Sequence, residues 1–275
     1  MVKNLMLNLI IIFATAQQSV SQEAISIVTD RPDITESSLT VPKYSIQIES
    51  GFSYSRNEFD NEIFYNDSLM NTPLTDQYFV TPGVLARYGL NDKIELRLGA
   101  QLTTVKSMNE NPQTINFTKT NVEGIDIAVK FKLSKQNNLL PSSALIAGSS
   151  IPALNPGSET DVFDPSFTFC FSNEITENLG VGYNLGFNLD DGFNSSASGA
   201  YSLSFNYLLI ESFGMFVEAY GFIPFSQNHA TNFADGGITV LIRSNIQLDF
   251  SGGYGLNSEN TEYFFSTGIS FRLPK

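Results

Sequence analysis

Apolar and polar residues alternate along most of this chain, in segments of about ten residues that begin near residue 44. The segment 94–103, with the sequence IELRLGAQLT, shows the pattern clearly. A period of two residues matches the β-strand, in which successive side chains point to opposite faces. The chain is therefore expected to form strands that each have one apolar and one polar face.

Twelve such strands are predicted, and the connections between them alternate between tight turns and longer stretches such as 56–75 and 105–121. The patterns of the second, fifth and ninth strands are the weakest. The predicted strands cover roughly 44–54, 77–88, 94–103, 124–133, 142–151, 166–172, 179–188, 201–207, 214–224, 235–243, 246–255 and 265–273.

Strand length separates the two folds that fit this pattern, a soluble β-sandwich and a membrane-spanning β-barrel. Strands of about ten residues match a tilted crossing of the bilayer, whereas soluble strands average about five or six. The polar faces carry small residues and charges of both signs, which suits a narrow barrel interior. We therefore predict an all-β fold, an antiparallel up-and-down barrel of about 12 strands that spans a membrane. The short turns and both chain ends are expected on the periplasmic side.

The amino terminus resembles a secretory signal peptide. Lys3 precedes an apolar run at 5–14, and Ala14 and Ala16 form an A-x-A cleavage site. About ten apolar residues are too few for a membrane-spanning helix, which needs roughly twenty. We assign residues 1–16 to the signal peptide, with cleavage as late as 21 as an alternative.

Export and the strand pattern together predict the outer membrane of a Gram-negative bacterium as the location of residues 44–275. The expected partners are the outer-membrane lipid, lipopolysaccharide and the barrel-assembly machinery. The preceding segment, 17–43, contains Pro32 and Pro42 and is expected to be irregular. Two arrangements fit it: a plug that forms ion pairs with the lumen through Arg31 and Asp33, or a free periplasmic segment.

The polar faces of the strands predict charged and aromatic side chains inside the barrel. A charge in a confined lumen is costly unless it is paired, so a network of ion pairs is expected. This network either holds a narrow barrel shut or lines a polar path that selects cargo. The predicted lumen charges are Glu49, Arg87, Glu95, Arg97, Asp126, Lys130, Lys132, Glu218, Asp235, Arg243, Asp249 and Arg272, and the predicted lumen aromatics are Phe79, Phe216, Tyr220 and Phe264.

Catalysis is not expected. Hydrolytic outer-membrane barrels need a His to activate Ser or water. The single His of this chain, His229, lies in a predicted loop and lacks the spacing of such enzymes. The sequence contains no motif for a cofactor and no metal-ligand cluster. A net charge of −13 argues against nucleic acid as a partner.

Several stretches resemble the bacterial outer-membrane proteins of the phenol-degradation meta-pathway family, which are often called transporters. The resemblance covers nearly the whole mature chain and has no catalytic residue to carry across. It implies a twelve-stranded barrel that passes small hydrophobic or aromatic compounds; a closed structural or surface-interaction barrel is the alternative. The matching stretches are 29–37 (TDRPDITES), 41–43, 48–52, 86–90 (ARYGL), 94–97, 124–126, 216–221 and 248–255.

Overall fold

A computed structural model of the chain describes residues 26–65, 68–109, 117–151, 163–190, 196–226, 229–256 and 261–274. Twelve β-strands are found among these residues. They are β1 (Ile46–Tyr65), β2 (Ser68–Asn91), β3 (Ile94–Asn109), β4 (Phe117–Ser134), β5 (Ser142–Ile151), β6 (Asp164–Glu174), β7 (Leu179–Asp190), β8 (Ser196–Ile210), β9 (Phe213–Pro224), β10 (Thr231–Arg243), β11 (Ile246–Gly255) and β12 (Thr261–Leu273).

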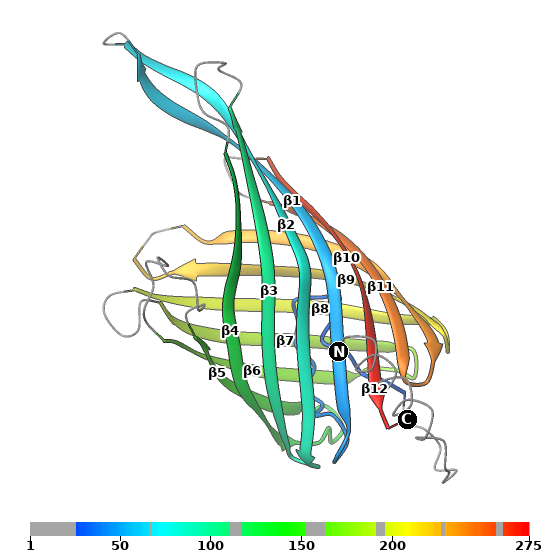
Figure 1. Cartoon of the computed structure of the whole chain (residues 1–275). Helices are drawn as coiled ribbons and strands as arrows, with labels where there is room; N and C mark the ends of the chain where they lie inside the picture. The colour runs from blue at the N-terminus through cyan, green and yellow to red at the C-terminus, as the bar shows by residue number, and fades with distance from the viewer. Residues whose placement is uncertain are drawn as a thin grey trace, which may run out of the picture.

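The strands form a closed antiparallel barrel, as the alternating pattern predicts (Figure 1). Each strand pairs with the next along the chain, and β1 pairs with β12 from Ile46↔Leu273 to Glu58↔Thr261. Closure leaves no free strand edge in the barrel wall. One end of the barrel carries the short turns, for example between Asn91 and Ile94, and we call it the turn side. The other end is the loop side.

The distribution of polar and apolar side chains in this barrel is the reverse of that in a soluble protein. Among the described residues, 24 polar or charged residues are buried, whereas only eight apolar ones are. On β9, Phe216 and Glu218 are buried while Met215 and Val217, which lie between and beside them, are exposed. Apolar side chains therefore cover the outside, where they would meet lipid, and the polar faces meet in the lumen. No helix among the described residues is long and apolar enough to cross a membrane.

The strands near the loop side extend further than the sequence pattern predicts. The stretch 56–75, predicted as a long connection, is instead a hairpin in which β1 and β2 stay paired from Phe59↔Leu74 to Tyr65↔Ser68. The predicted connection 105–121 is likewise shortened by the ends of β3 and β4. Figure 1 shows this part of β1 and β2 projecting beyond the other strands. Pairing across a hairpin keeps backbone groups bonded where no further wall strand is present.

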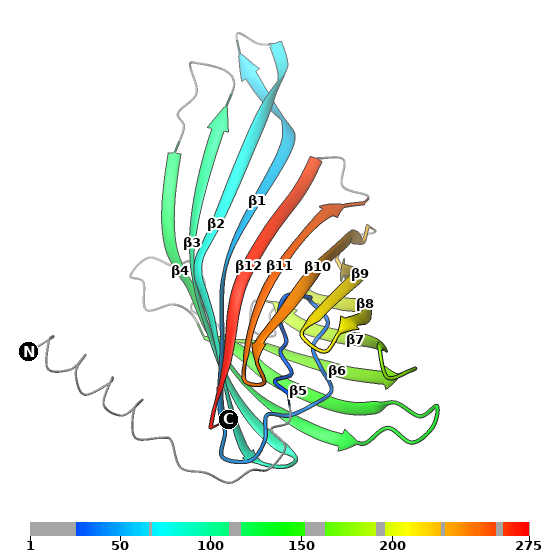
Figure 2. The same cartoon turned by 90° about the vertical axis from the view of Figure 1, so that its right-hand side faces the viewer.

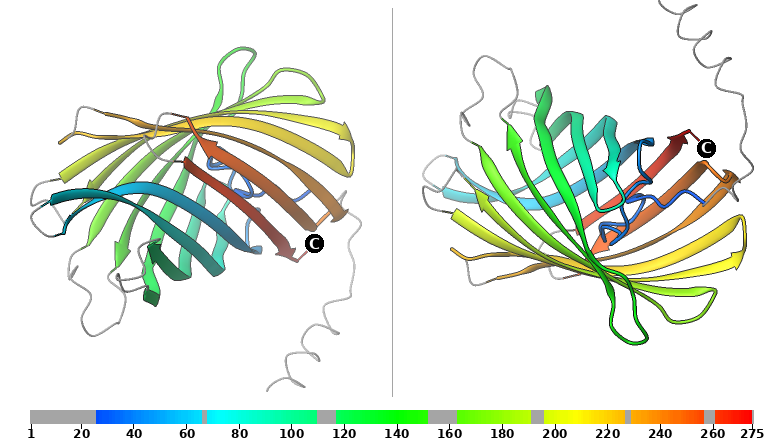
Figure 3. Two further views of the ribbon diagram at one scale, coloured as in Figure 1. Left: turned by 90° about the horizontal axis from the view of Figure 1, so that it is seen from above. Right: turned by 90° about the horizontal axis from the view of Figure 1, so that it is seen from below.

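Residues 26–43 form an irregular segment inside the barrel, which we call the lumen segment (Figures 2 and 3). The predicted amino-terminal segment is 17–43; its described part, 26–43, lies in the lumen, and residues 17–25 lie outside the described residues. The segment leaves the lumen close to β2, where the Tyr44 amide donates to the Gly89 carbonyl at 2.7 Å. A Cβ on Gly89 would lie 2.2 Å from the Pro42 oxygen, so this crossing requires glycine. The predicted signal peptide, 1–16, lies outside the described residues.

Candidate functional site: a divided lumen

The wall formed by β1 to β4 carries a network of buried ion pairs. Arg87 on β2 is 1% exposed; its Nη1 lies 2.8 Å from Glu49 Oε1 and its Nε lies 2.8 Å from Glu95 Oε1. These three residues face one another because Glu49 and Glu95 lie on the two strands that flank β2. Each charge is therefore compensated within the barrel wall.

The lumen segment adds Asp30 to the centre of this network. Its Oδ2 lies 3.0 Å from Arg87 Nη1, 2.6 Å from Arg97 Nη1 and 3.2 Å from Lys130 Nζ. Burial opposes ionisation of Asp30, but Arg87, Lys130 and Arg97 together hold its pKa well below the usual range. The Asp30 amide also donates to Glu49 at 3.0 Å. Three cations from three strands thus hold one carboxylate of the segment.

Glu36 is the second anchor of the segment on the same wall. Arg97 Nη2 donates to both carboxylate oxygens at 2.9 Å, and Lys130 Nζ lies 3.7 Å away. Burial raises the pKa of Glu36 to about 7, against the opposing effect of Arg97. With its amide turned to satisfy both groups, Asn184 on β7 accepts from the Glu36 amide and donates to the Glu36 carbonyl. The backbone here therefore spans the lumen from β3 to β7.

Arg31 lies in a slot between two glycines. Gly51 on β1 and Gly268 on β12 are directly opposite each other in the register. A Cβ on Gly51 would lie 2.3 Å from Arg31 Nη2, and one on Gly268 would lie 2.5 Å from Arg31 Nε. The guanidinium donates to Asp249 Oδ1 at 3.1 Å and to Ser266 Oγ at 2.9 Å. Only a wall without side chains at these two positions can accept the guanidinium so closely.

The opposite wall, formed by β8 to β10, carries acids without basic partners. Glu218 accepts hydrogen bonds from the amides of Ile34 and Thr35 at 2.8 and 2.7 Å and from the Thr35 hydroxyl. Asp235 lies opposite Glu218 in the register. In the part of the chain that the structure describes, neither carboxylate forms an ion pair with Lys or Arg.

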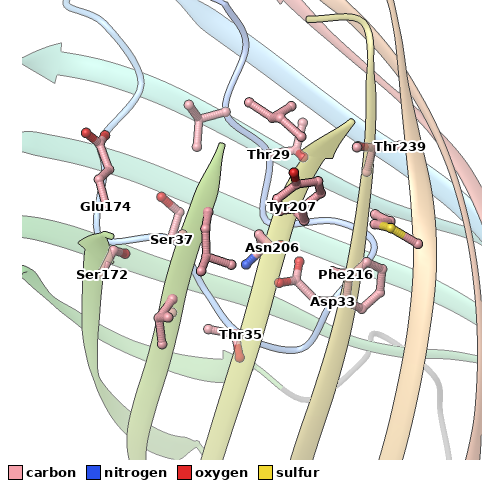
Figure 4. Close-up of a pocket in the computed structure, with 18 of the residues that line it drawn as sticks. Thr29, Asp33, Thr35, Ser37, Ser172, Glu174, Asn206, Tyr207, Phe216 and Thr239 are labelled. Atoms are coloured by element: carbon pink, nitrogen blue, oxygen red, sulfur yellow. The ribbon is translucent and has the colours of Figure 1, made fainter. Parts of the chain in front are cut away.

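The lumen segment separates two cavities. The turn-side cavity has a volume of about 510 Å³ and is bounded by Asp33, Asn206 and Phe216, among other residues (Figure 4). The loop-side cavity has a volume of about 360 Å³ and lies against β2 to β6. Arg31 and Glu36 line both cavities. These two side chains therefore belong to the partition between the two halves of the lumen.

The predicted lumen charges fall into three groups. Nine are buried in the barrel interior: Glu49, Arg87, Glu95, Arg97, Lys130, Glu218, Asp235, Asp249 and Arg272. Asp126 lines the loop-side cavity, is exposed and accepts a hydrogen bond from Ser150. Lys132 is partly buried and Arg243 is exposed, and both lie close to the turn-side end of their strands. The structure therefore does not bring these last two residues into the network.

Three of the four predicted lumen aromatics point inward. Phe216 and Tyr220 are buried on the inner face of β9, and the Phe264 ring packs over Gly253 beside Asp235. The Phe79 ring instead lies 5.1 Å from the Tyr54 ring.

The position of Phe79 corrects the sequence-based assignment. Tyr54 is opposite both Phe79 and Phe265, so the three share a face, and Phe265 is exposed on the outer surface. An irregularity in β2 between Val80 and Gly83 inserts one extra residue. The residues of β2 that come before this irregularity therefore point to the opposite face from the one that strict alternation predicts. Strict alternation from Arg87 therefore assigns Phe79 to the wrong face.

Sequence reasoning missed two residues of the site, Asp30 and Glu36, as partners of the wall. It expected Arg31 and Asp33 to form the ion pairs of the segment, and Asp33 lies near the Glu218 carboxylate instead. Burial, and then Glu218, raise the pKa of Asp33 well above its usual range. The available signal was the density of charges in 29–37, a segment with no strand pattern of its own.

A family model described as "Putative MetA-pathway of phenol degradation" matches residues 29–273. The structure is similar to the crystal structure of the COG4313 outer membrane channel from Pseudomonas putida F1, with 12% identity and a TM-score of 0.58 over 93% of this chain and 100% of that one. It is also similar to the translocator domain of the autotransporter NalP from Neisseria meningitidis, with 9% identity and a TM-score of 0.53 over 85% and 90%. No curated protein matches the chain. The fold is that of a bacterial outer-membrane β-barrel.

Proposed function

Because the chain belongs to the family described as the putative MetA pathway of phenol degradation, we propose that it is a channel for small aromatic or hydrophobic compounds. The channel lies in the outer membrane of a Gram-negative bacterium, with its turn side toward the periplasm. The family assignment supports the aromatic class of cargo, and the similarity in fold to a crystallised outer-membrane channel supports the barrel architecture.

The observation that carries the proposal is the pair of cavities on the two sides of the lumen segment. A dead core would be filled with side chains at the density of a protein interior. Here about 510 Å³ and 360 Å³ are open, and Arg31 and Glu36 of the lumen segment line both cavities. Cavities of this size match those that hold drug-sized molecules. Displacement of this one segment would connect them.

A closed structural barrel is the second candidate, and the charge network favours it. Asp30 is held by three cations, and Glu36 by a bidentate pair with Arg97. Such pairs are among the strongest polar contacts in proteins. A segment fixed in this way would keep the two cavities permanently apart.

Single-channel recording of the mature protein in a planar bilayer separates the two candidates. The channel predicts stable openings that phenol or benzoate, added to one side, blocks reversibly. Deletion of residues 22–40 removes the partition and should raise the conductance several-fold. The matched control is the substitution Arg243→Gln, which changes an exposed charge outside the network. Silent bilayers from both the complete protein and the deletion variant, each with confirmed folding, would support the closed barrel and contradict the channel.

A further inference from the structure

We propose that aromatic cargo binds an aromatic stripe on the inner face of β9 and β10 and crosses the partition between this stripe and the apex of the lumen segment, residues 33–35. This inference rests on the proposed channel and names the surface that would select its cargo. The stripe consists of Phe216, Tyr220 and Phe222 on β9 and Phe233 on β10.

The rings of the stripe reach from the turn-side cavity, which Phe216 lines, toward the loop side (Figure 4). Phe216, Tyr220 and Phe222 are separated by even intervals on β9, so they share the inner face. Phe233 lies opposite Tyr220, and the two rings stack at a centroid distance of 5.1 Å. The Phe222 ring lies 6.1 Å from the Tyr220 ring and 6.4 Å from the Phe233 ring. Phe222 points inward but is 41% exposed, whereas the other three residues are buried. Its ring therefore offers open aromatic surface at the loop-side end of the stripe.

The stripe and the wall formed by β1 to β4 differ in what they offer an aromatic molecule. The inner face of β1 to β4 carries buried ion pairs, whose charged groups already satisfy one another. Aromatic rings attract a further ring in offset-stacked or edge-to-face arrangements, beyond the gain from burial of apolar surface. The stripe is interrupted at the level where Glu218 and Asp235 face each other. An aromatic molecule in the lumen should therefore lie along β9 and β10.

The apex of the lumen segment docks at this interruption through hydrogen bonds. Glu218 accepts from the amides of Ile34 and Thr35, and the Thr35 hydroxyl donates to the Ser202 hydroxyl on β8 at 2.7 Å. Among the described residues, the ion pairs of the segment go to β2, β3, β4 and β11, and none goes to β8, β9 or β10. The apex can therefore move away from the stripe while the segment stays anchored on the wall of β1 to β4. Such a movement would open a path past Glu218 with a ring of the stripe on either side.

Phenol and cyclohexanol test the stripe, because both carry one hydroxyl group on a six-membered ring and only phenol is aromatic. Each is added to the loop side of single channels of the complete mature protein. Phenol should block at a concentration about fivefold lower than cyclohexanol, the factor expected from one aromatic contact. Phe222→Leu should bring the two concentrations to within about twofold, and Phe222→Tyr should keep the difference. Phe205→Leu, the same change on the exposed outer face of β8, is the control and should leave the difference unaltered.

Two engineered disulfides locate the opening. The hydroxyl oxygens of Thr35 and Ser202 are 2.7 Å apart and those of Ser38 and Ser142 are 2.6 Å apart, so cysteines at either pair of positions could be bridged. Both pairs are introduced together with Cys170→Ala, which removes the natural cysteine. Oxidation of Thr35→Cys with Ser202→Cys ties the apex to β8 and should abolish the openings until dithiothreitol is added. Oxidation of Ser38→Cys with Ser142→Cys holds the segment on β5, away from the stripe, and should leave the openings.

Each outcome supports or overturns a part of the proposal. Equal block by phenol and cyclohexanol, or a difference that survives Phe222→Leu, would overturn the stripe and leave the channel standing. Openings that persist when the apex is tied to β8, or that disappear under both bridges, would overturn the path past the apex.

Binding keeps the stripe testable in a protein that never conducts. The measurement is saturation-transfer NMR of phenol on the detergent-solubilised mature protein. A phenol signal that Phe222→Leu weakens and Phe205→Leu does not would support the stripe as a binding surface, and silent bilayers would then overturn the channel alone. Equal signals in the two variants would overturn the stripe.

Discussion

The effect of substituting a charged residue in this lumen depends on the charges that lose their partner. Arg87 compensates Glu49, Glu95 and Asp30 at once, and it is almost fully buried. A buried ion pair contributes little net stability as a unit, but loss of one partner strands the other charge in the interior. The cost of a substitution is therefore set by the acids that stay behind.

Arg87→Met should destabilise the barrel by about 3–5 kcal/mol, the range for breaking a buried pair. The measurement is the guanidinium midpoint of unfolding, followed by the heat-modifiable shift of the folded band. Arg243→Met, which changes an exposed arginine, is the control and should stay within about 0.5 kcal/mol. Equal midpoints for the two variants would contradict the role of the network.

The slot that holds Arg31 depends on the absence of a side chain at Gly51. Gly51→Ala places a methyl group 2.3 Å from the Arg31 guanidinium, so the side chain must leave the slot. We expect longer or more frequent openings in single-channel records, because Arg31 belongs to the partition between the cavities. Arg31→Ala combined with Gly51→Ala should behave like Arg31→Ala alone. Additive effects of the two substitutions would show that the methyl group acts elsewhere.

At the scale of elements, the lumen segment behaves as a ligand of its own barrel. Its docked state binds protons differently from its free state, so pH shifts the balance between them. The charged groups that face Glu36 are Arg97 on β3, Lys130 on β4 and Asp30 on the segment, and the Cys170 thiol on β6 is also close enough to interact. Docking raises the pKa of Glu36 from 4.5 to about 7, and that of Asp33 also rises.

The sign of the pH effect follows from these two shifts. Between pH 7 and about 4.5, the docked segment binds a proton at Glu36 that the free segment does not bind, so acid favours docking. The pKa of Asp30 is lowered in the docked segment. Protonation of Asp30 therefore opposes docking only at pH values below the ordinary pKa of an aspartate. Open probability should therefore fall as the pH is lowered from 8 to 5. In Glu36→Gln the slope should be clearly shallower; an unchanged slope would exclude Glu36 as the titrating group.

Individual strands show how far the sequence pattern reaches. On β9 the alternation is unbroken, and Phe216, Glu218 and Tyr220 point inward as predicted. On β2 one extra residue between Val80 and Gly83 reverses the faces, and the local signal for it, Pro82-Gly83 inside a strand pattern, shows that a bulge is present but not which faces result. The partners of Asp30 lie 57 to 100 positions away in the sequence, so they depend on barrel closure and cannot be derived from periodicity.

At the scale of the whole molecule, the barrel and its projecting hairpin are separable. The pairing of β1 with β12 ends at Glu58↔Thr261, and that of β2 with β3 ends at Leu74↔Asn109. Beyond these positions β1 and β2 pair only with each other among the described strands. Backbone pairing in the wall therefore does not depend on the tip of the hairpin.

Replacement of residues 60–73 by a short Asn-Gly turn should leave a folded, heat-modifiable barrel, because a two-residue hairpin turn suits the twist of the strands. Its conductance should remain within about twofold of the parent, since the lumen segment and both cavities stay intact. A variant that does not fold under the same conditions would show that the projection is needed for assembly.

The slot that holds Arg31 has one wall from the first strand and one from the last, Gly51 and Gly268. It therefore does not exist until the two ends of the sheet have met. The contacts of Asp30 and Glu36 with β1 to β4 do not depend on that seam, whereas the seat of Arg31 does. The last contact of the segment to form is therefore the one that is made across the closed seam, and the position of Arg31 reports whether the sheet has closed.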